Sequence, residues 1–358
     1  MDVAFAKCIT LLFLFVFLSG GTVSFCSTIK KSDSLLCIES EKQALLSFKQ
    51  DLVDIFDSLS SWIAEAEDCC RWTGIVCDNI TGHINELHLT TGSLRGKINP
   101  SLLNLTHLTH LELNSFNANG AQIPKFLSSL VHLRYLDLTN ANFSGMIPQQ
   151  LGNLSNLYHL SLGYYLSSPK ELYANNLEWL CGLSSLEFLD LSFVNLSKAS
   201  DHWLLAINKL PSLLELHLSH SELSHIHRLP ARVNFTSLEV LDISGNNFNS
   251  VLPDWIFSLS NLIRLDLYDS NFIGPFPNGS WILNSLTHLA AGHNYLSNST
   301  IPSYLYGFPS LEYLDLSNNN LQGVLSSAIG NLTSISSLHL SNNSLKGELP
   351  VVTKKKIP

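Results

Sequence analysis

The chain has 358 residues, with leucine at about one position in five and charged residues at only 14%. This composition and a mean hydropathy of +0.17 exclude a disordered chain and a coiled coil. A formal charge of −9 and a pI near 5.8 argue against the basic face that nucleic acid requires, so we expect no nucleic-acid partner. The length suits about two domains or one extended repeat array.

The first 26 residues have the pattern of a secretory signal peptide. Residues 9–18, ITLLFLFVFL, form an apolar run that follows a lysine and precedes small residues. The run is too short to span a bilayer, so an uncleaved anchor is the less favoured alternative. We expect cleavage between residues 21 and 27, after Gly21, Ser24 or Cys26. No later stretch has the length of a membrane span, so we expect none in this chain.

Secretion makes disulfides the expected state of the cysteines that follow. Cys37, Cys69, Cys70 and Cys77 form an even-numbered cluster, which suits two bridges in an oxidising compartment. Three connectivities are open, and strain disfavours a bridge between the adjacent Cys69 and Cys70. A zinc site is the weaker alternative, because no histidine lies within the cluster. Cys181 stands apart, and we expect a buried thiol there in preference to an intermolecular partner.

Residues 38–52 predict a short amphipathic helix. Ala44, Leu45, Phe48 and Leu52 recur there at helical spacing and define one apolar face. We expect this helix to cover the open N-terminal end of the core that follows, because repeat arrays need a cap.

An L-x-x-L-x-L pattern then recurs along the chain at intervals of 24 to 29 residues. Alternation within L-x-L puts both leucines on one face of a short strand. One such strand buries too little to be stable alone, so we expect the copies to stack into a parallel sheet over a continuous leucine core. The second leucine of each copy is Leu87, Leu111, Leu136, Leu160, Leu189, Leu216, Leu241, Leu265, Leu289, Leu314 or Leu338.

Two further positions of the repeat carry conformational information. A buried asparagine five residues after the second leucine can satisfy backbone groups in the turn between coils. This position holds Asn246, Asn294, Asn319 and Asn343, but elsewhere residues such as Gly92, Ala141, Val194 and Ser270. The second half of the repeat reads G-x-I-P, where glycine permits a tight turn and proline restricts φ.

Specific phrases in the chain resemble plant extracellular repeats. CCRWTGIVC at 69–77 and SEKQALLSFKQDL at 40–52 resemble the plant leucine-rich-repeat N-terminal cap. With LDLSNNNLQG at 314–323 and LGNLSNL at 151–157, the chain resembles the plant receptor-like proteins of the xylanase-receptor and pathogen-resistance types. The resemblance covers residues 37 to 350. It implies an α/β solenoid, a right-handed superhelix with a parallel concave β-sheet and a disulfide-stapled N-terminal cap.

The resemblance also implies disulfides Cys37–Cys69 and Cys70–Cys77. It implies an extracellular module that senses microbial elicitors or peptides in defence signalling, through a partner co-receptor kinase. The expected domains are a signal peptide at 1–26, a cap at 27–80, eleven leucine-rich repeats at 81–350 and an uncapped basic tail at 351–358.

The C-terminal end departs from that family. The last repeat runs into VVTKKKIP at 351–358, with neither a C-terminal cysteine pair nor a membrane helix. We therefore expect a location at the plasma membrane if the full-length member has such a helix, and otherwise in the apoplast. Two alternatives stay open: a secreted inhibitor similar to the polygalacturonase-inhibiting proteins, and a non-signalling decoy or truncated remnant.

No motif of an enzyme, a cofactor site or a metal site occurs in the chain. The sequence lacks a Walker loop, an H-E-x-x-H motif, a nucleophile elbow and the kinase signatures, and leucine-rich coils offer no deep pocket. We therefore expect a non-enzyme without a cofactor. His217, His220, His225 and His227 have no recurring ligand spacing, so we interpret them as solvated side chains.

The outward strand residues are the predicted ligand-binding face. Aspartate and glutamate are frequent among them, whereas Arg264 is the one basic residue. This balance favours a basic or hydrogen-bonding ligand. Their histidines, with ordinary pKa values near 6.5, are expected to gain charge in a mildly acidic cell wall. The candidate residues are Glu86, His88, His110, Glu112, Tyr135, Asp137, His159, Phe188, Asp190, Glu215, His217, Asp242, Arg264, Asp266, Tyr268, His288, Tyr313, Asp315 and His339.

N-glycosylation sequons offer a second mark of that face. In several copies the sequon lies four residues before the first aliphatic position, on the outer coil, and only Asn342 abuts an exposed strand residue. We expect glycans to leave the sheet open for a protein or peptide partner. The alternative is that asparagine-rich repeats generate sequons by composition. The sequons begin at Asn79, Asn104, Asn142, Asn153, Asn195, Asn234, Asn278, Asn298, Asn331 and Asn342.

Overall fold

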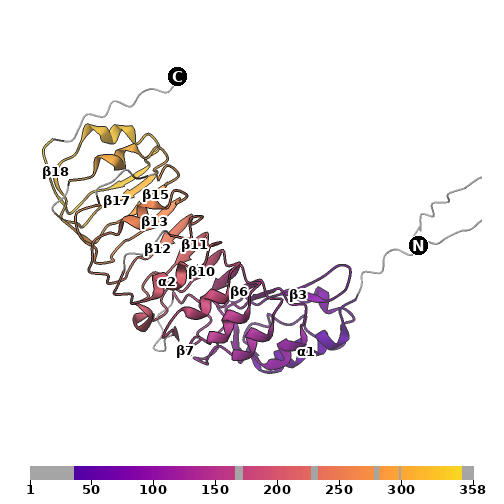
Figure 1. Cartoon of the computed structure of the whole chain (residues 1–358). Helices are drawn as coiled ribbons and strands as arrows, with labels where there is room; N and C mark the ends of the chain where they lie inside the picture. Colours follow the sequence, from indigo (N-terminus) through magenta and orange to yellow (C-terminus); the bar gives the residue numbers. More distant parts are fainter. Residues whose placement is uncertain are drawn as a thin grey trace, which may run out of the picture.

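The structure, a computed structural model, is a bent coil that runs continuously from the N-terminal to the C-terminal end (Figure 1). It describes residues 36–165, 172–226, 233–277, 281, 283–297 and 300–348. The predicted signal peptide, the predicted basic tail, His227 and the sequons at Asn278 and Asn298 lie outside these residues.

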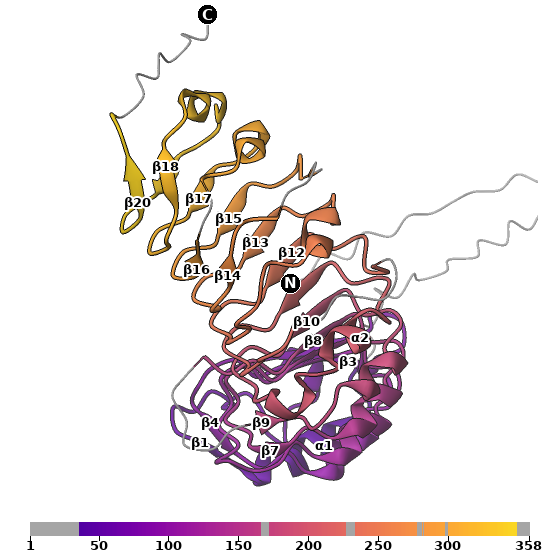
Figure 2. The same ribbon diagram turned by 60° about the vertical axis from the view of Figure 1, so that its left-hand side comes forward.

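The main sheet takes one short strand from each copy of the leucine pattern. These strands are parallel and stack in chain order, as Figure 2 shows for β8 to β17. At the N-terminal edge, β2 pairs antiparallel with β3. The strands are β2 (Ile75–Cys77), β3 (Ile84–His88), β5 (His110–Glu112), β6 (Tyr135–Asp137), β8 (His159–Ser161), β10 (Phe188–Asp190), β11 (Glu215–His217), β12 (Val240–Asp242), β13 (Arg264–Asp266), β15 (His288–Ala290), β17 (Tyr313–Asp315) and β19 (Ser337–His339).

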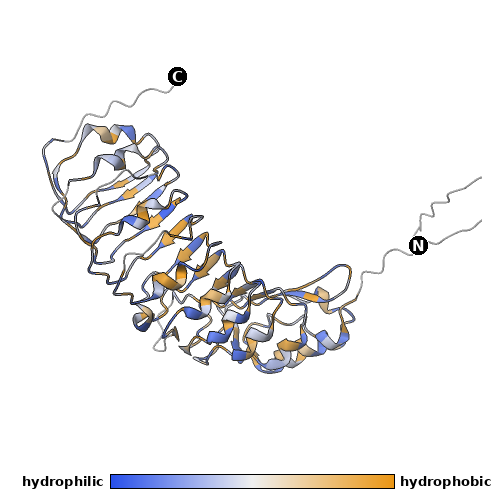
Figure 3. Cartoon of the chain, viewed as in Figure 1, coloured by the Kyte–Doolittle hydropathy of each residue, from blue (hydrophilic) through white to orange (hydrophobic). Residues whose placement is uncertain are grey.

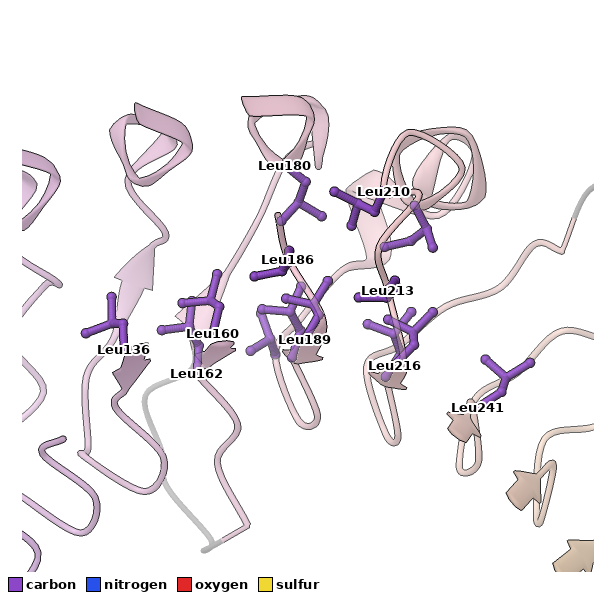
Figure 4. Close-up of a cluster of buried hydrophobic side chains, with 14 of the residues drawn as sticks. Leu136, Leu160, Leu162, Leu180, Leu186, Leu189, Leu210, Leu213, Leu216 and Leu241 are labelled. Atoms are coloured by element: carbon purple, nitrogen blue, oxygen red, sulfur yellow. The ribbon is translucent and has the colours of Figure 1, made fainter. Parts of the chain in front are cut away.

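The leucine core lies directly behind this sheet. The register pairs the second leucine of each copy with that of the next, for example Leu160 with Leu189 and Leu189 with Leu216. Figure 4 shows these side chains in one row, and each is almost completely buried. Apolar residues recur in every coil along the molecule (Figure 3). The predicted parallel sheet and continuous leucine core are therefore confirmed.

Asparagines in the C-terminal half join successive coils by hydrogen bonds. Nδ2 of Asn294 donates to the carbonyl of Leu267 in the preceding coil at 2.8 Å, and its Oδ1 accepts from the N–H of Phe272 at 2.9 Å. The predicted role of these asparagines is confirmed. Ser270, which was expected to interrupt the series, donates its hydroxyl to the carbonyl of Ile243 at 2.9 Å and so replaces part of this bonding. We call Asn246, Asn294, Asn319 and Asn343 the asparagine ladder.

The outer side of the coil carries short helices. In the middle of the molecule, strands β6 to β12 line the inner side of the bend, and the outer side lies opposite them (Figure 1). The short helices are η1 (Cys69–Arg71), η2 (Pro100–Asn104), η3 (Lys125–Ser129), η4 (Gln149–Asn153), η5 (Glu178–Gly182), η6 (Ser197–Ala199), α2 (Trp203–Ile207), η7 (Asp254–Ser258), η8 (Ser303–Gly307) and η9 (Ser327–Asn331).

Small two-stranded sheets are formed by the segments that follow the strands of the main sheet. They pair β7 (Gly145–Met146) with β9 (Leu172–Tyr173), β14 (Ile273–Gly274) with β16 (Tyr295–Leu296), and β18 (Gln322–Val324) with β20 (Ser344–Lys346). The glycines of the G-x-I-P segments lie here at positive φ, 84° at Gly145 and 76° at Gly274. Other residues rarely adopt this conformation, so glycine is favoured here, but both glycines belong to short strands and not to the tight turns that the sequence predicted.

The N-terminal cap closes the end of the core. Helix α1 (Glu39–Gln50) buries Ala44, Leu45 and Phe48, as predicted. Its predicted end is wrong by two residues, because Leu52 belongs to β1 (Leu52–Asp54), which pairs antiparallel with β4 (Leu94–Gly96). The backbone leaves the helix there to hydrogen-bond to β4. Disulfides Cys37–Cys69 and Cys70–Cys77 are present, as the resemblance implied.

Cys181 does not have the expected buried thiol. It is exposed on η5, while the preceding Trp179 and Leu180 turn into the core. A short helix buries only some of its residues, and the next one along therefore faces solvent. Among the described residues, no helix is both long and apolar enough to cross a membrane.

Candidate functional site

The outward face of the main sheet presents two rows of side chains, one on each side of the buried second leucine. Residues of one row lie beside each other because the parallel register aligns every copy. The upstream row holds Glu86, His110, Tyr135, His159, Phe188, Glu215, Val240, Arg264, His288, Tyr313 and Ser337. The downstream row holds His88, Glu112, Asp137, Ser161, Asp190, His217, Asp242, Asp266, Ala290, Asp315 and His339. Of the candidate residues only Tyr268 lies outside both rows, in the turn after β13.

Four rings of the upstream row form a stack, which we call the aromatic column: His110, Tyr135, His159 and Phe188. Successive ring centroids are 3.9, 4.0 and 4.1 Å apart, and the planes differ by only 5° to 10°. Neighbouring parallel strands are about 4.8 Å apart, so rings at matching positions meet face to face. The column therefore follows from the register of β5 to β10.

Stacking decides which part of each ring a ligand meets. The faces of Tyr135 and His159 are covered on both sides by the rings of the adjacent strands. Their edges carry the tyrosine hydroxyl and the imidazole nitrogens, and these edges are the parts of the rings that the stack leaves uncovered. All four side chains are half-buried. The column thus presents ring edges and not ring faces in a line across the strands, although Nε2 of His110 is buried.

The aromatic column is uncharged near neutral pH. Burial lowers the pKa of His159 to about 4, although Asp137 opposes this shift. Burial, aided by the nearby carboxylates of Asp137 and Glu112, raises the pKa of Tyr135 to about 12. Burial also lowers the pKa of His110 and of His288. The expectation that the strand histidines titrate near 6.5 is therefore wrong for these three.

The aspartates of the downstream row are structural rather than exposed. Asp137, Asp190 and Asp315 are only 7%, 4% and 6% exposed, which contradicts their expected availability. Each accepts a hydrogen bond from the backbone N–H two residues on, at 2.7 to 2.8 Å. This Asx-type contact holds the turn that leaves the strand.

Two turn acids of the C-terminal half remain half-buried. Asp242 accepts from the N–H of Ser244 in the same way. Asp266 accepts from Nη2 of Arg264 at 3.1 Å, and burial, then the nearby Asp242, raise its pKa. The outward face therefore exposes fewer carboxylates than the sequence predicted.

Histidine and carboxylate side chains gather at the N-terminal end of the face. Nδ1 of His88 lies 2.8 Å from Oε2 of Glu112, and its Nε2 lies 2.8 Å from Oε2 of Glu86. Burial lowers the pKa of His88, but the two carboxylates outweigh it, so the pKa is raised. The ring of His110 lies 4.5 Å from that of His88. In the middle of the sheet, Nε2 of His217 lies 3.2 Å from Oε2 of Glu215.

The structure adds aromatic residues at the edge of the face, where the strands end. Phe193 stacks on His220 at 4.7 Å and meets Tyr165 edge to face at 5.6 Å. Phe193 and His220 occupy the fourth position after the second leucine, where φ is positive in many copies, here 61° and 50°. Sequence analysis missed this cluster. The available signal was that Phe193 and His220 occupy the same position in successive repeats. Tyr268 makes a comparable contact with His293 at 4.8 Å.

The sequons lie outside the two rows, and Asn342 comes nearest to them because it occupies the same repeat position as Phe193. Within the described part of the chain, no sequon asparagine belongs to a strand of the main sheet. Asn104, Asn153 and Asn331 each form the last residue of an outer helix, η2, η4 and η9. Their use as glycan acceptors stays a prediction.

One shallow hollow lies outside the two rows. It has a volume of about 220 Å³ and is lined by Tyr173, Ala174, Asn195, Ser197 and Lys198. These five residues include no histidine, cysteine or carboxylate. The expectation that the chain is not an enzyme stays a prediction.

Those of the histidines interpreted as solvated that the structure describes do not converge on one another. His217 contacts Glu215, His220 stacks on Phe193, and Nδ1 of His225 lies 3.3 Å from Oδ1 of Asp201. Ligand-type atoms instead converge at His88, His110 and Glu112. The sequence signals there were E-L-H at 86–88 and H-L-E at 110–112, one repeat apart.

Comparisons with known proteins agree with this architecture. A family model described as a leucine rich repeat N-terminal domain matches residues 38–78, and leucine rich repeat models match 132–154, 236–296 and 299–345. Receptor-like protein EIX2 of Solanum lycopersicum is 36% identical over 351 residues, 92% of this chain and 34% of that protein. This chain is a leucine-rich-repeat protein homologous to the plant receptor-like proteins.

Other receptor-like proteins show the same relationship. EIX1 of Solanum lycopersicum is 36% identical over 281 residues, 72% of this chain and 26% of that protein. Receptor-like protein 6 of Arabidopsis thaliana is 30% identical over 352 residues, 93% of this chain and 30% of that protein. The leucine-rich-repeat chain thus spans about a third or less of the length of these relatives.

Solved structures confirm the predicted solenoid fold. The crystal structure of PEPR1–AtPEP1 is 27% identical, with a TM-score of 0.58 over 88% of this chain and 50% of that one. A plant ice-binding protein is 26% identical, with a TM-score of 0.59 over 88% of this chain and 90% of that one. Because one leucine-rich-repeat fold serves such different proteins, its function has to be argued from the side chains of the face.

Proposed function

We propose that this chain is an extracellular ligand-recognition module of the receptor-like type. It binds an extended peptide or protein segment across the outward face of the parallel sheet. The aromatic column is the observation that carries the proposal, because it places rigid, half-buried rings side by side on a bare sheet face. Rigid aromatic side chains give large contact area at low entropic cost, which suits them to anchor a protein or peptide partner.

The stacking of the rings favours a peptide over a sugar. A sugar ring binds an aromatic side chain on its exposed face, but the faces of Tyr135 and His159 are occupied. The exposed edges offer a hydroxyl and imidazole nitrogens, which can exchange hydrogen bonds with a peptide backbone. The charged groups on either side, Glu86 with His88 and Arg264 with Asp266, would fix the register of such a segment.

The relatives also support a proposal for the wider setting of the module. We place the module in the secretory pathway and at the cell surface, as part of a longer receptor that signals through a partner kinase. Its homology to receptor-like proteins and its two cap disulfides support this setting. The ligand class includes microbial elicitors and peptides. The inhibitor and decoy alternatives gain no specific support from the face.

A peptide selection tests the proposal without a known ligand. The probe is a phage library of random peptides, selected on the secreted and glycosylated chain. Enriched peptides should bind the Tyr135→Ala and Phe188→Ala variants more than about tenfold more weakly. Lys125→Ala, an exposed change on the outer helix η3, is the matched control and should leave the affinity unchanged.

Two results would overturn the proposal. Selection without enrichment would remove the peptide class. Peptides that keep their affinity for the two aromatic variants but lose it for Lys125→Ala would move the site to the outer side. Glycopeptide mass spectrometry on the same material should find glycans only at asparagines outside the strands of the main sheet.

A further inference from the structure

We propose that His88, His110 and Glu112 form a zinc site at the N-terminal end of the outward face. Their ligand atoms all lie within 4.8 Å of one another. Two imidazoles and one carboxylate form a donor set that suits Zn²⁺ and disfavours Mg²⁺ or Ca²⁺, which prefer oxygen.

The buried nitrogen of His110 is an independent observation that points to a ligand. Nε2 of His110 is buried and has no hydrogen-bond partner in the part of the chain that the structure describes. Oε2 of Glu112 lies 4.0 Å away, which is too far for a hydrogen bond. Buried polar nitrogens are normally bonded, so an orphan beside a carboxylate and a second imidazole requires an explanation. A metal ion between these groups supplies one.

The distances fit a tetrahedral ion after small side-chain movements. With bonds of about 2.0 to 2.1 Å, two zinc ligands lie about 3.4 Å apart. The present separations are 2.8 Å between Nδ1 of His88 and Oε2 of Glu112, and 4.0 Å between Nε2 of His110 and the same oxygen. The two values lie on either side of the required one. The imidazole planes differ by 41°, so the in-plane lone pairs of the two rings are able to converge.

Glu86 completes the arrangement from outside the ligand set. Its Oε2 lies 2.8 Å from Nε2 of His88, the nitrogen that faces away from Glu112. A metal-bound histidine commonly donates its other N–H to a carboxylate, which fixes its tautomer and orientation. The side chains of His88, His110 and Glu112 are 21% to 29% exposed, so a hydrated ion can enter from the face. Three protein ligands leave one position open next to the aromatic column.

A second histidine cluster in the described chain is a poorer candidate. Glu41, His83 and His107 also lie close together. However, Glu41 is only 2% exposed, and its two oxygens already bind Nδ1 of His83 and the N–H of Ile84, each at 2.7 Å. The rings of His83 and His107 are stacked at 3.6 Å, so their lone pairs run side by side. This cluster joins the cap helix to β3 and serves as an internal control.

Calorimetric titration of the secreted full chain with zinc chloride tests the site. We expect one tight zinc, and no comparable heat with magnesium chloride. Glu112→Gln and His110→Phe should each weaken zinc binding by more than about 100-fold, and Glu86→Gln by about tenfold. His110→Phe keeps a ring that can stack on Tyr135, and Glu112→Gln provides a second variant if folding fails. Bound Co²⁺ should show the visible absorption of a tetrahedral site.

The control variants decide the location. His288→Phe changes a ring of the same row near the other end of the sheet, and His107→Ala disrupts the second cluster. Neither change should alter the affinity for zinc. The proposal is overturned if zinc gives no binding heat, if affinity survives both Glu112→Gln and His110→Phe, or if it is lost with His107→Ala.

Discussion

The two halves of the main sheet share one register but hold their coils together differently. From β12 to β19 the asparagine ladder bonds the turns to the coil before them, for example through Asn246 to the carbonyl of Leu218 at 2.8 Å, and Ser270 takes this place in the copy after β13. Between β5 and β10 the same position holds the buried, apolar Phe116, Ala141 and Val194, and the exposed Tyr165 in the copy after β8. Packing of apolar side chains therefore replaces buried hydrogen bonds in the N-terminal half.

The outward side chains of the two halves also differ. The N-terminal half carries the aromatic column and the carboxylate–histidine group around His88. In the outward rows of the C-terminal half, the described residues form one stacked pair, His288 with Tyr313. The comparison teaches that a repeat can preserve its backbone by either device, which leaves the outward rows free to acquire different chemistry.

The largest expected difference between the halves concerns the turn position. Asn294→Val should lower local stability by about 3 kcal/mol, because the N–H groups of Ser270 and Phe272 lose a buried acceptor. Val194→Ala, the matched change in the other half, removes only apolar contacts and should cost about 1.5 kcal/mol. Native-state hydrogen exchange should show fast exchange at Ser270 and Phe272 only in the asparagine variant. Equal protection of both amides in the two variants would contradict the difference.

Aromatic substitutions should separate the halves by a smaller amount. Tyr135 has two parallel ring partners, at 3.9 and 4.0 Å, whereas Tyr313 has one at 4.1 Å and a tilted one at 5.4 Å. Each stacked pair contributes about 1 kcal/mol. Tyr135→Ala should therefore destabilise the sheet by about 2 kcal/mol and Tyr313→Ala by about 1 kcal/mol, measured by hydrogen exchange at β6 and β17. The reverse order would show that the column contributes little to stability.

The pH dependence of stability should follow His159. In the unfolded chain this histidine gains a proton as pH falls through about 6.5, whereas in the folded protein burial holds its pKa near 4. The unfolded state then binds more protons, so stability is lost as pH falls from about 6.5 to 4. Thermal unfolding of His159→Phe should show a weaker loss between pH 7 and pH 5 than the parent protein. An unchanged pH slope would refute the role of burial.

The smallest expected effect is a gain at the edge cluster. Phe193 holds a φ of 61°, which is strained for a bulky side chain, whereas Asn318 occupies the matching position in the C-terminal half at 52°. Phe193→Asn should relieve that strain but lose the ring contacts with His220 and Tyr165, which leaves a net stabilisation of no more than about 0.5 kcal/mol. Chemical unfolding compares it with Asn318→Phe, which should be destabilised. If Phe193→Asn is the less stable protein, the ring contacts outweigh the strain.

Much of the architecture could be predicted from sequence because the same pattern of residues recurs in every repeat. The recurring leucines, the glycines of the G-x-I-P segments and the ladder asparagines each occupy a fixed phase, and one local rule serves every copy. The helix of the cap could likewise be predicted from the spacing of Ala44, Leu45 and Phe48. The disulfide pairing was not, since four cysteines permit three connectivities and only the family resemblance selected between them.

The chemistry of the outward face was decided by tertiary structure. Sequence placed Asp137 and His159 on the face but could not show that a turn N–H binds the first or that neighbouring rings cover the second. Likewise, His88 and Glu112 are 24 residues apart and meet only because β3 and β5 align in register. Burial and pKa depend on what the adjacent coil places alongside a residue, whereas the period of the leucines depends on the strand alone. The sequence by itself therefore determined the coil, and the stacking of coils determined which of its outward groups are charged, covered or able to bind.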